Sequence, residues 1–216
     1  MRIAVLGTGM VGRAIAGRLV GLGHEVTMGS RSAANEDALA WAEEAGGSAS
    51  AGTFADAAAG AELVFNCTSG VASLEALTSA GTEHLDGKVL VDVANPLDFS
   101  RGMPPTLTIC NDDSLAEQIQ RAFPGARVVK ALNTVNASIM VEPEKLSDPG
   151  TIFHCGNDEG AKAQVRELLE SFGWPAEQVL DLGDISAARG MEMYLPLWVR
   201  MMGALDSAAF NIRVAQ

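Results

Sequence analysis

The chain has 216 residues, of which 48% are hydrophobic and 19% are charged, a composition typical of one folded domain and not of a disordered protein. The formal net charge of −12 argues against nucleic-acid binding, because phosphate backbones require clustered Lys and Arg. No apolar run is long enough to span a bilayer. The glycine motif already begins at Gly7, so we expect no signal or transit peptide, and hence a cytoplasmic protein.

The three cysteines, Cys67, Cys110 and Cys155, are scattered along the chain. They form neither a CxxC pair nor a spacing typical of a zinc site. We expect all three to be reduced and most of them to be buried, and we expect no metal site.

In chain order, the first half alternates between strand and helix patterns. Residues 10–22 carry apolar residues at helical spacing, and Asn35 is placed to cap a helix over 35–45. A short strand near Ser48 and a short helix after Thr53 are expected in a stretch rich in small residues. Glycine-bounded apolar or β-branched runs predict further strands at 2–7, 24–29, 62–70 and 87–96.

The second half continues the alternation. Helices are predicted within 113–123 and 161–173, and strands within 126–134, 150–157 and 177–183. Strands that alternate with helices form βαβ units. The sequence therefore predicts an α/β fold, with a Rossmann-type, doubly wound, mostly parallel sheet over residues 1–183.

Residues 184–216 form a different, small helical segment with two apolar stripes. One stripe runs from Ile185 to Leu205, and the other includes Leu197. Pro196 should break or kink the segment and suits the first turn of a second helix. Three interpretations stay open: deeper core, a lid over a cleft, or a dimer contact.

The glycine-rich stretch Gly7-Thr8-Gly9-Met10-Val11-Gly12 lies between the first strand and the first helix. Gly7 permits the tight turn, Gly9 lets a pyrophosphate approach the backbone, and Gly12 lets the helix pack closely on the strand. The helix N-terminus then faces the anion. This context predicts a dinucleotide-binding site.

At the end of the second strand, where NAD-binding relatives carry an acid for the adenosine ribose, this chain has Gly29, Ser30, Arg31 and Ser32. Ser30 can donate a hydrogen bond to a 2′-phosphate, Arg31 can hold it by charge-assisted bonds, and Ser32 can assist. The pattern favours NADP over NAD.

With its opening at 7–31 and the later stretches 91–99, 128–140 and 195–214, the chain resembles the coenzyme F420-dependent NADP oxidoreductases. The same pattern recurs in the cytosolic domain of six-transmembrane ferric reductases. The resemblance covers nearly the whole chain. It implies hydride transfer between NADP(H) and the deazaflavin coenzyme F420 in a homodimer.

The resemblance also implies positions for the site. Thr8 and the glycines would follow the pyrophosphate, and Ser30 and Arg31 the 2′-phosphate. Where the deazaflavin enzymes usually have a lysine, this chain has Asn35. Strand ends and the loops after them would contribute further cofactor contacts, which we expect from Cys67, Thr68, Ser69, Asn95, Pro96 and Asn133.

We identify no catalytic side chain, because the two cofactors carry the chemistry of hydride transfer. One alternative acceptor is a flavin that relays electrons to ferric iron. An imine or small-carbonyl reductase would need a proton donor, so Tyr194 or Lys130 would have to reach the cleft. A non-catalytic NADP sensor is the third alternative. For Lys130 we favour a structural or cofactor-facing role.

Overall fold

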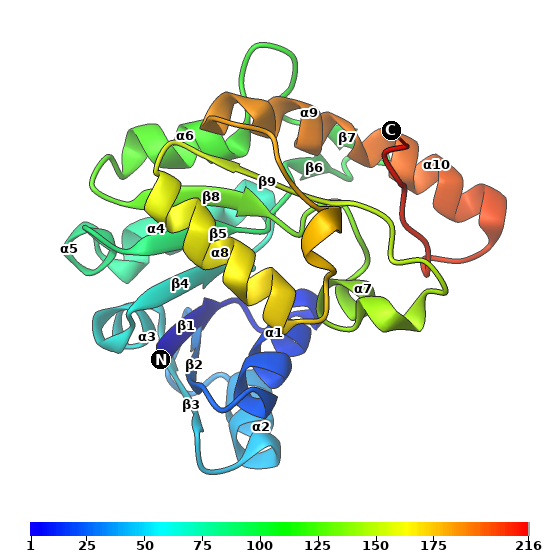
Figure 1. The fold of residues 1–216 in the computed structure, drawn as a ribbon. Helices are drawn as coiled ribbons and strands as arrows, with labels where there is room; N and C mark the ends of the chain where they lie inside the picture. Colours follow the sequence, from blue (N-terminus) through cyan, green and yellow to red (C-terminus); the bar gives the residue numbers. More distant parts are fainter. Residues whose placement is uncertain (216) are drawn as a thin grey trace.

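The computed structural model describes residues 1–215 as one central sheet with helices on both faces (Figure 1). The eight strands lie in the order β10-β9-β8-β5-β4-β1-β2-β3. Their bounds, which confirm the predicted strands, are Arg2–Leu6 (β1), Glu25–Ser30 (β2), Ala49–Thr53 (β3), Leu63–Asn66 (β4), Val89–Asp92 (β5), Arg127–Ala131 (β8), Ile152–Gly156 (β9) and Val179–Asp181 (β10).

The helices bury one apolar side each against the sheet, which confirms the doubly wound fold. On one face, Ile15, Trp41, Ile139 and Val165 belong to a common core with the strands. They come from α1 (Met10–Gly21), α2 (Glu36–Ala45), α7 (Ala137–Val141) and α8 (Glu159–Ser171).

The other face has its own core, which includes Phe54, Leu77, Ile119 and Met191. These residues come from α3 (Phe54–Gly60), α4 (Ser73–Ala80), α6 (Leu115–Ala122) and α9 (Ala188–Met193). The sequence did not indicate α4, the short α5 (Thr82–Leu85), or the two-stranded hairpin of β6 (Leu97–Asp98) and β7 (Thr106–Leu107).

One part of the sheet departs from the predicted βαβ alternation. From β3 to β8 neighbouring strands are parallel, but β9 runs antiparallel to β8, with Ala131 opposite His154, and β10 runs parallel to β9. The connection over 132–151 contains α7, a helix of 5 residues. Such a helix rises only about 7 Å, too little to carry the chain back across the sheet, so the chain re-enters at the edge where β8 ends.

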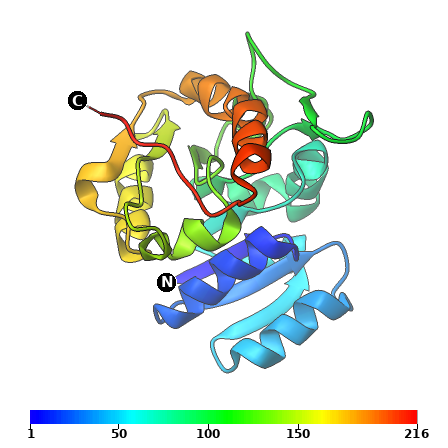
Figure 2. The same cartoon turned by 90° about the vertical axis from the view of Figure 1, so that its right-hand side faces the viewer.

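The C-terminal segment forms the predicted helix pair, α9 and α10 (Leu195–Leu205), and Pro196 stands in the first turn of α10. Met191 and Leu195 are buried, whereas Leu197 and Leu205 are 56% and 58% exposed. Figure 2 shows α10 beyond α1 and α7, at the edge of the molecule. The last predicted residue of this segment, Gln216, lies outside the described residues.

Two of the composition-based expectations meet the structure here. The three cysteines are free, but Cys110 is exposed and Cys67 half-buried, so the prediction that most are buried was wrong. The chain after β7 runs over the surface, which explains the exposure of Cys110. Within residues 1–215, every helix is too short or too polar to cross a bilayer.

Candidate functional site

Two adjoining cavities lie at the carboxyl edge of the sheet, beside β1 and β4. The strand order reverses between these two strands, which is where open α/β sheets bind ligands. The first cavity measures about 330 Å³ and the second about 370 Å³. They share Cys67, Thr68 and Ser69, which follow β4. A ligand with two linked parts could therefore occupy both.

The glycine turn forms the floor of the first cavity. Gly7 has φ +120°, and a Cβ there would lie 2.6 Å from the Cys67 carbonyl oxygen. A Cβ on Gly12 would lie 2.1 Å from the Gly7 carbonyl oxygen, which explains the close packing of α1 on the turn. At Gly9 a Cβ would meet no described atom within 4 Å. The N-terminus of α1, capped by no side chain, thus stays open to an anion.

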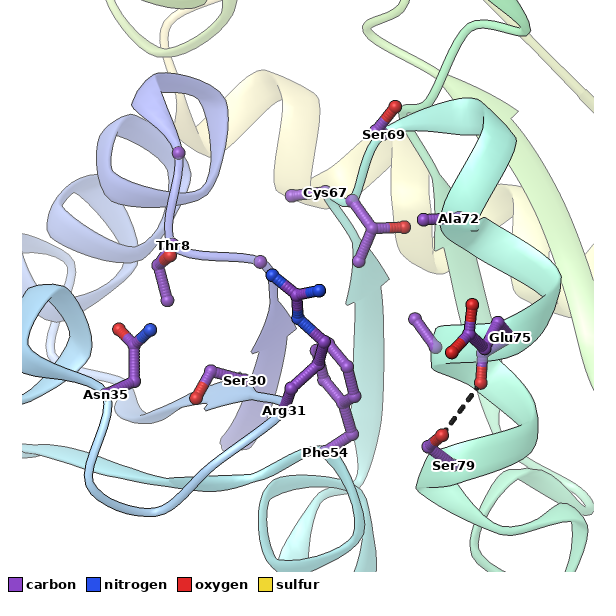
Figure 3. A pocket seen from close by; sticks show the side chains of 14 residues that line it. Thr8, Ser30, Arg31, Asn35, Phe54, Cys67, Ser69, Ala72, Glu75 and Ser79 are labelled. Atoms are coloured by element: carbon purple, nitrogen blue, oxygen red, sulfur yellow. Dashed lines mark hydrogen bonds between the residues drawn. The ribbon is translucent and has the colours of Figure 1, made fainter.

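Arg31 provides positive charge at the mouth of the first cavity. Figure 3 shows its side chain projecting from the loop after β2, with Phe54 beside it and Thr8 and Asn35 across the space. Arg31 is exposed, and among the described residues nothing forms a hydrogen bond or salt bridge with it. Its guanidinium is therefore available to a bound anion.

Ser30 and Asn35 are held by local hydrogen bonds. The Ser30 hydroxyl is buried and donates to the Ser32 carbonyl oxygen at 2.7 Å, so it could donate to a phosphate only after giving up that bond. Asn35 Oδ1 accepts from the Ala38 N–H at 2.9 Å and caps α2. The NH₂ group of Asn35 remains as a donor on the cavity wall.

The opposite wall of the first cavity comes from α4, which the sequence analysis missed. Apolar residues at helical spacing over 73–80 were the available signal. Figure 3 shows Glu75 and Ser79 on this wall, facing Arg31 across the cavity. The lining residues absent from the predicted site are Asn35, Phe54, Ala72, Glu75, Ala76 and Ser79.

The second cavity is largely apolar. Met10, Val11, Asn95 and Asn133 line it as predicted positions, whereas Gly12 and Pro96 line neither cavity. The apolar side chains that the prediction did not include are Val93, Leu97, Phe99, Val135, Met140, Leu195 and Trp198, among others. The last two belong to α10, and the Trp198 ring stacks on Phe210 at 5.3 Å.

Asn95 and Asn133 join the two loops of this cavity. The Asn133 amide donates to Asn95 Oδ1 at 2.9 Å and to the Met191 carbonyl oxygen at 3.1 Å. The Asn95 amide donates in return to the Asn133 carbonyl oxygen at 2.9 Å. Their amide N–H groups are thus used to hold the loops and α9 together.

Beneath the second cavity lies a buried charged cluster. Lys130 Nζ is 2.8 Å from both Asp92 Oδ2 and Glu192 Oε1 and also donates to the Ala94 carbonyl oxygen. Burial alone would lower the pKa of Lys130, but the two carboxylates outweigh it and raise that pKa, so the ammonium is retained. Glu192 also accepts from the N–H of Leu115 at 2.8 Å, at the N-terminus of α6. That helix end balances the extra negative charge.

No proton donor among the expected residues reaches the cavities. Lys130 is fully buried and lines neither, and Tyr194 lines neither, with burial raising its pKa to about 12. Burial, with a smaller contribution from Asp92, raises the pKa of the Cys67 thiol, which therefore stays neutral. Within residues 1–215 there is no group of three or more His, Cys, Asp or Glu placed to hold a metal ion.

Known proteins resemble this chain over most of its length. The family model described as "NADP oxidoreductase coenzyme F420-dependent" matches residues 2–96. The F420-dependent NADP reductase of Methanothermobacter marburgensis is 31% identical over 210 residues, which cover 93% of this chain and 92% of that protein.

A crystal structure from Arthrobacter sp. FB24, provisionally designated an F420-dependent NADP-reductase, is 55% identical, with a TM-score of 0.94 and 100% of both chains covered. The rat metalloreductase STEAP3 is 29% identical over 201 residues. That match covers 91% of this chain but only 38% of STEAP3.

Proposed function

This chain belongs to the family of coenzyme F420-dependent NADP oxidoreductases, and from that premise we propose that it transfers a hydride between NADP(H) and coenzyme F420. The observation that carries the proposal is the pair of adjoining cavities, one with the features of an anion-binding dinucleotide site and the other apolar. Hydride transfer requires two cofactors side by side, and the cavities meet at Thr68.

In the first cavity, we propose that the adenosine half of NADP(H) binds along the glycine turn. The open N-terminus of α1 and the bare Gly9 suit a pyrophosphate. The unpaired guanidinium of Arg31 suits a 2′-phosphate. The Asn35 amide adds a neutral donor where the family usually has a lysine. This set supports a preference for NADP(H) over NAD(H).

In the second cavity, the nicotinamide and a flat acceptor would lie between the loop after β8 and α10. The bound rings supply the hydride donor and acceptor. The chain's own residues hold and shield them: Val135, Met140 and Leu195 exclude water, and the hydrogen bonds between Asn95 and Asn133 fix the loops. Methionine adapts well to flat aromatic surfaces.

The alternative of an imine or carbonyl reductase has less support. That reaction needs a proton donor beside the hydride. Lys130 is enclosed by Asp92 and Glu192, and Tyr194 lies off the cavity lining. A flavin acceptor and a non-catalytic NADP sensor are separated from the proposal by the assay below.

The decisive assay is NADPH oxidation by the purified protein, offered F420, FMN, FAD and a ferric chelate separately. Turnover with F420 alone is the expected result. Turnover only with a flavin would move the chain to the flavin or ferric reductase type. NADPH binding without turnover would support the sensor.

Arg31→Ala tests the cofactor preference within the same assay. We expect it to weaken NADPH binding by about 1.5–3 kcal/mol, as for a hydrogen bond to a charged group, and to leave NADH binding unchanged. Arg101→Ala is the matched control, because Arg101 is exposed and lines neither cavity. Equal losses for both cofactors in Arg31→Ala would refute the 2′-phosphate assignment.

We further propose that the chain forms a homodimer, since α10 leaves Leu197 and Leu205 exposed. Light scattering of the purified protein gives its mass, and a monomer would overturn this proposal. The cytoplasmic location and the division into 1–183 and 184–216 remain predictions from the sequence.

A further inference from the structure

Thr68 stands at the junction of the two cavities, and its side chain ends a chain of hydrogen bonds that begins in the core. Lys130 Nζ lies 2.8 Å from Asp92 Oδ2, and Asn66 Nδ2 lies 2.8 Å from Asp92 Oδ1. Asn66 Oδ1 then lies 2.7 Å from Thr68 Oγ1. Asn66, Asp92 and Lys130 are fully buried, so water does not compete for these bonds.

The direction of every bond in this chain is fixed at its buried end. An ammonium has three N–H donors and no acceptor, and those of Lys130 go to Asp92, Glu192 and the Ala94 carbonyl oxygen. Asp92 meets only donors, since the Ala94 N–H also points to its Oδ1 at 3.3 Å. Asn66 must therefore turn its NH₂ group toward Asp92.

The outer end fixes the same orientation independently. The Thr68 backbone N–H, which can only donate, lies 3.3 Å from Asn66 Oδ1. A flipped amide would set oxygen against Asp92 and NH₂ against this N–H. Because Asn66 Oδ1 can only accept, the Thr68 hydroxyl must give it its one hydrogen. Ser73 Oγ, 3.1 Å from Thr68 Oγ1, already has the Ser69 carbonyl oxygen as an acceptor at 3.2 Å.

We propose that Lys130, Asp92 and Asn66 are positioning residues that make Thr68 Oγ1 an acceptor-only group at the cavity junction. The junction then selects a ligand group that carries an N–H or O–H, and disfavours a phosphate oxygen, which has no hydrogen to give. Resting on the proposed function, this partner is a donor of the nicotinamide riboside half of NADP(H): its carboxamide NH₂ or a ribose hydroxyl.

The first test measures NADP⁺ binding by calorimetry in Thr68→Val and Thr68→Ser. Valine keeps the shape of threonine and lacks the hydroxyl, whereas serine keeps the hydroxyl. Loss of one hydrogen bond predicts about 5- to 10-fold weaker binding for Thr68→Val and near wild-type binding for Thr68→Ser. Wild-type affinity in Thr68→Val, or an equal loss in Thr68→Ser, would overturn the proposal.

An analogue of NADP⁺ with a methyl ketone in place of the carboxamide identifies the donor. If Thr68→Val weakens NADP⁺ binding but not analogue binding, the carboxamide NH₂ is the donor. If it weakens both equally, a ribose hydroxyl is the donor. Either result supports an acceptor-only Thr68.

A double-mutant cycle tests the positioning role of Asn66. Asn66→Ala should weaken NADP⁺ binding in the wild-type background and have little effect when added to Thr68→Val, since it acts through that hydroxyl. A residue with only a structural role would weaken binding equally in both backgrounds, which would overturn the role of Asn66. Absence of NADP⁺ binding by the wild-type protein would refute the proposed function itself.

Discussion

The first cavity is built from residues close together in the chain, from Gly7 to Asn35, with α3 and α4 closing it. The second takes its walls from Met10 at one end of the chain and Trp198 near the other. The two regions are also secured differently. The glycine turn depends on the absence of side chains, whereas the C-terminal helices are tied to the sheet by a buried charge cluster.

This difference separates two kinds of specification. A turn that needs positive φ and bare backbone leaves its mark in the local sequence. A buried ion cluster needs partners far apart in the chain: Lys130 and Glu192 are separated by 62 positions. The cluster contributes orientation more than net stability, since burying charges costs free energy that their attraction only offsets.

The largest effect should come from breaking the cluster. Lys130→Met leaves two carboxylates buried without their cation, and we expect unfolding free energy to fall by about 3–5 kcal/mol in urea titrations. Lys145→Met is the matched control, because Lys145 forms an exposed ion pair with Glu142, worth at most about 1 kcal/mol. Similar losses in both variants would show that the cluster does not anchor the C-terminal region.

A smaller loss is expected in the glycine turn. Gly12→Ala places a Cβ against the Gly7 carbonyl oxygen, and overpacking of this kind costs about 1–3 kcal/mol of unfolding free energy. Gly17→Ala, on the same helix but with open space at the added Cβ, should be neutral or stabilising by up to about 1 kcal/mol. Equal stability of the two variants would contradict the packing role of Gly12.

The smallest effect concerns pH and the antiparallel part of the sheet. His154 in β9 is buried, and neither ring nitrogen has a hydrogen-bond partner among the described residues. Burial lowers its pKa, and Lys162 and Arg166 lower it further against the opposing Asp181 and Glu159. The unfolded chain takes up a proton near pH 6.5, the ordinary value of about 6.5, so stability should fall as the pH drops below it.

Urea titrations across this pH range measure the effect. One proton bound on unfolding gives a slope of at most about 1.4 kcal/mol per pH unit, and His154→Leu should remove that contribution. An unchanged slope in His154→Leu would show that other groups set the acid sensitivity of this part of the sheet.

Much of the fold follows from local pattern. Buried strands such as β1 and β5 are apolar runs, and Asn35 is a helix cap that the sequence predicts from its position. The direction of β9 could not be predicted in this way, because it depends on where the segment 132–151 runs in space.

The site divides similarly. Gly7 and Arg31 could be predicted because turn geometry and charge are local properties. Glu75 and Trp198 could not, because their places on the cavity walls depend on how α4 and α10 pack. For Glu192 a signal was present: a single acid between Met191 and Met193 in an apolar helix requires a buried partner.

The place of Glu192 in the chain has a consequence for synthesis. A ribosome makes Asp92 and Lys130 well before Glu192, so the sheet with its first cavity can begin to fold while the second still lacks α10. Until residue 192 appears, Lys130 has one carboxylate partner and the start of α6 has none. The nascent protein would thus acquire its cofactor cradle before the wall that encloses the reacting rings.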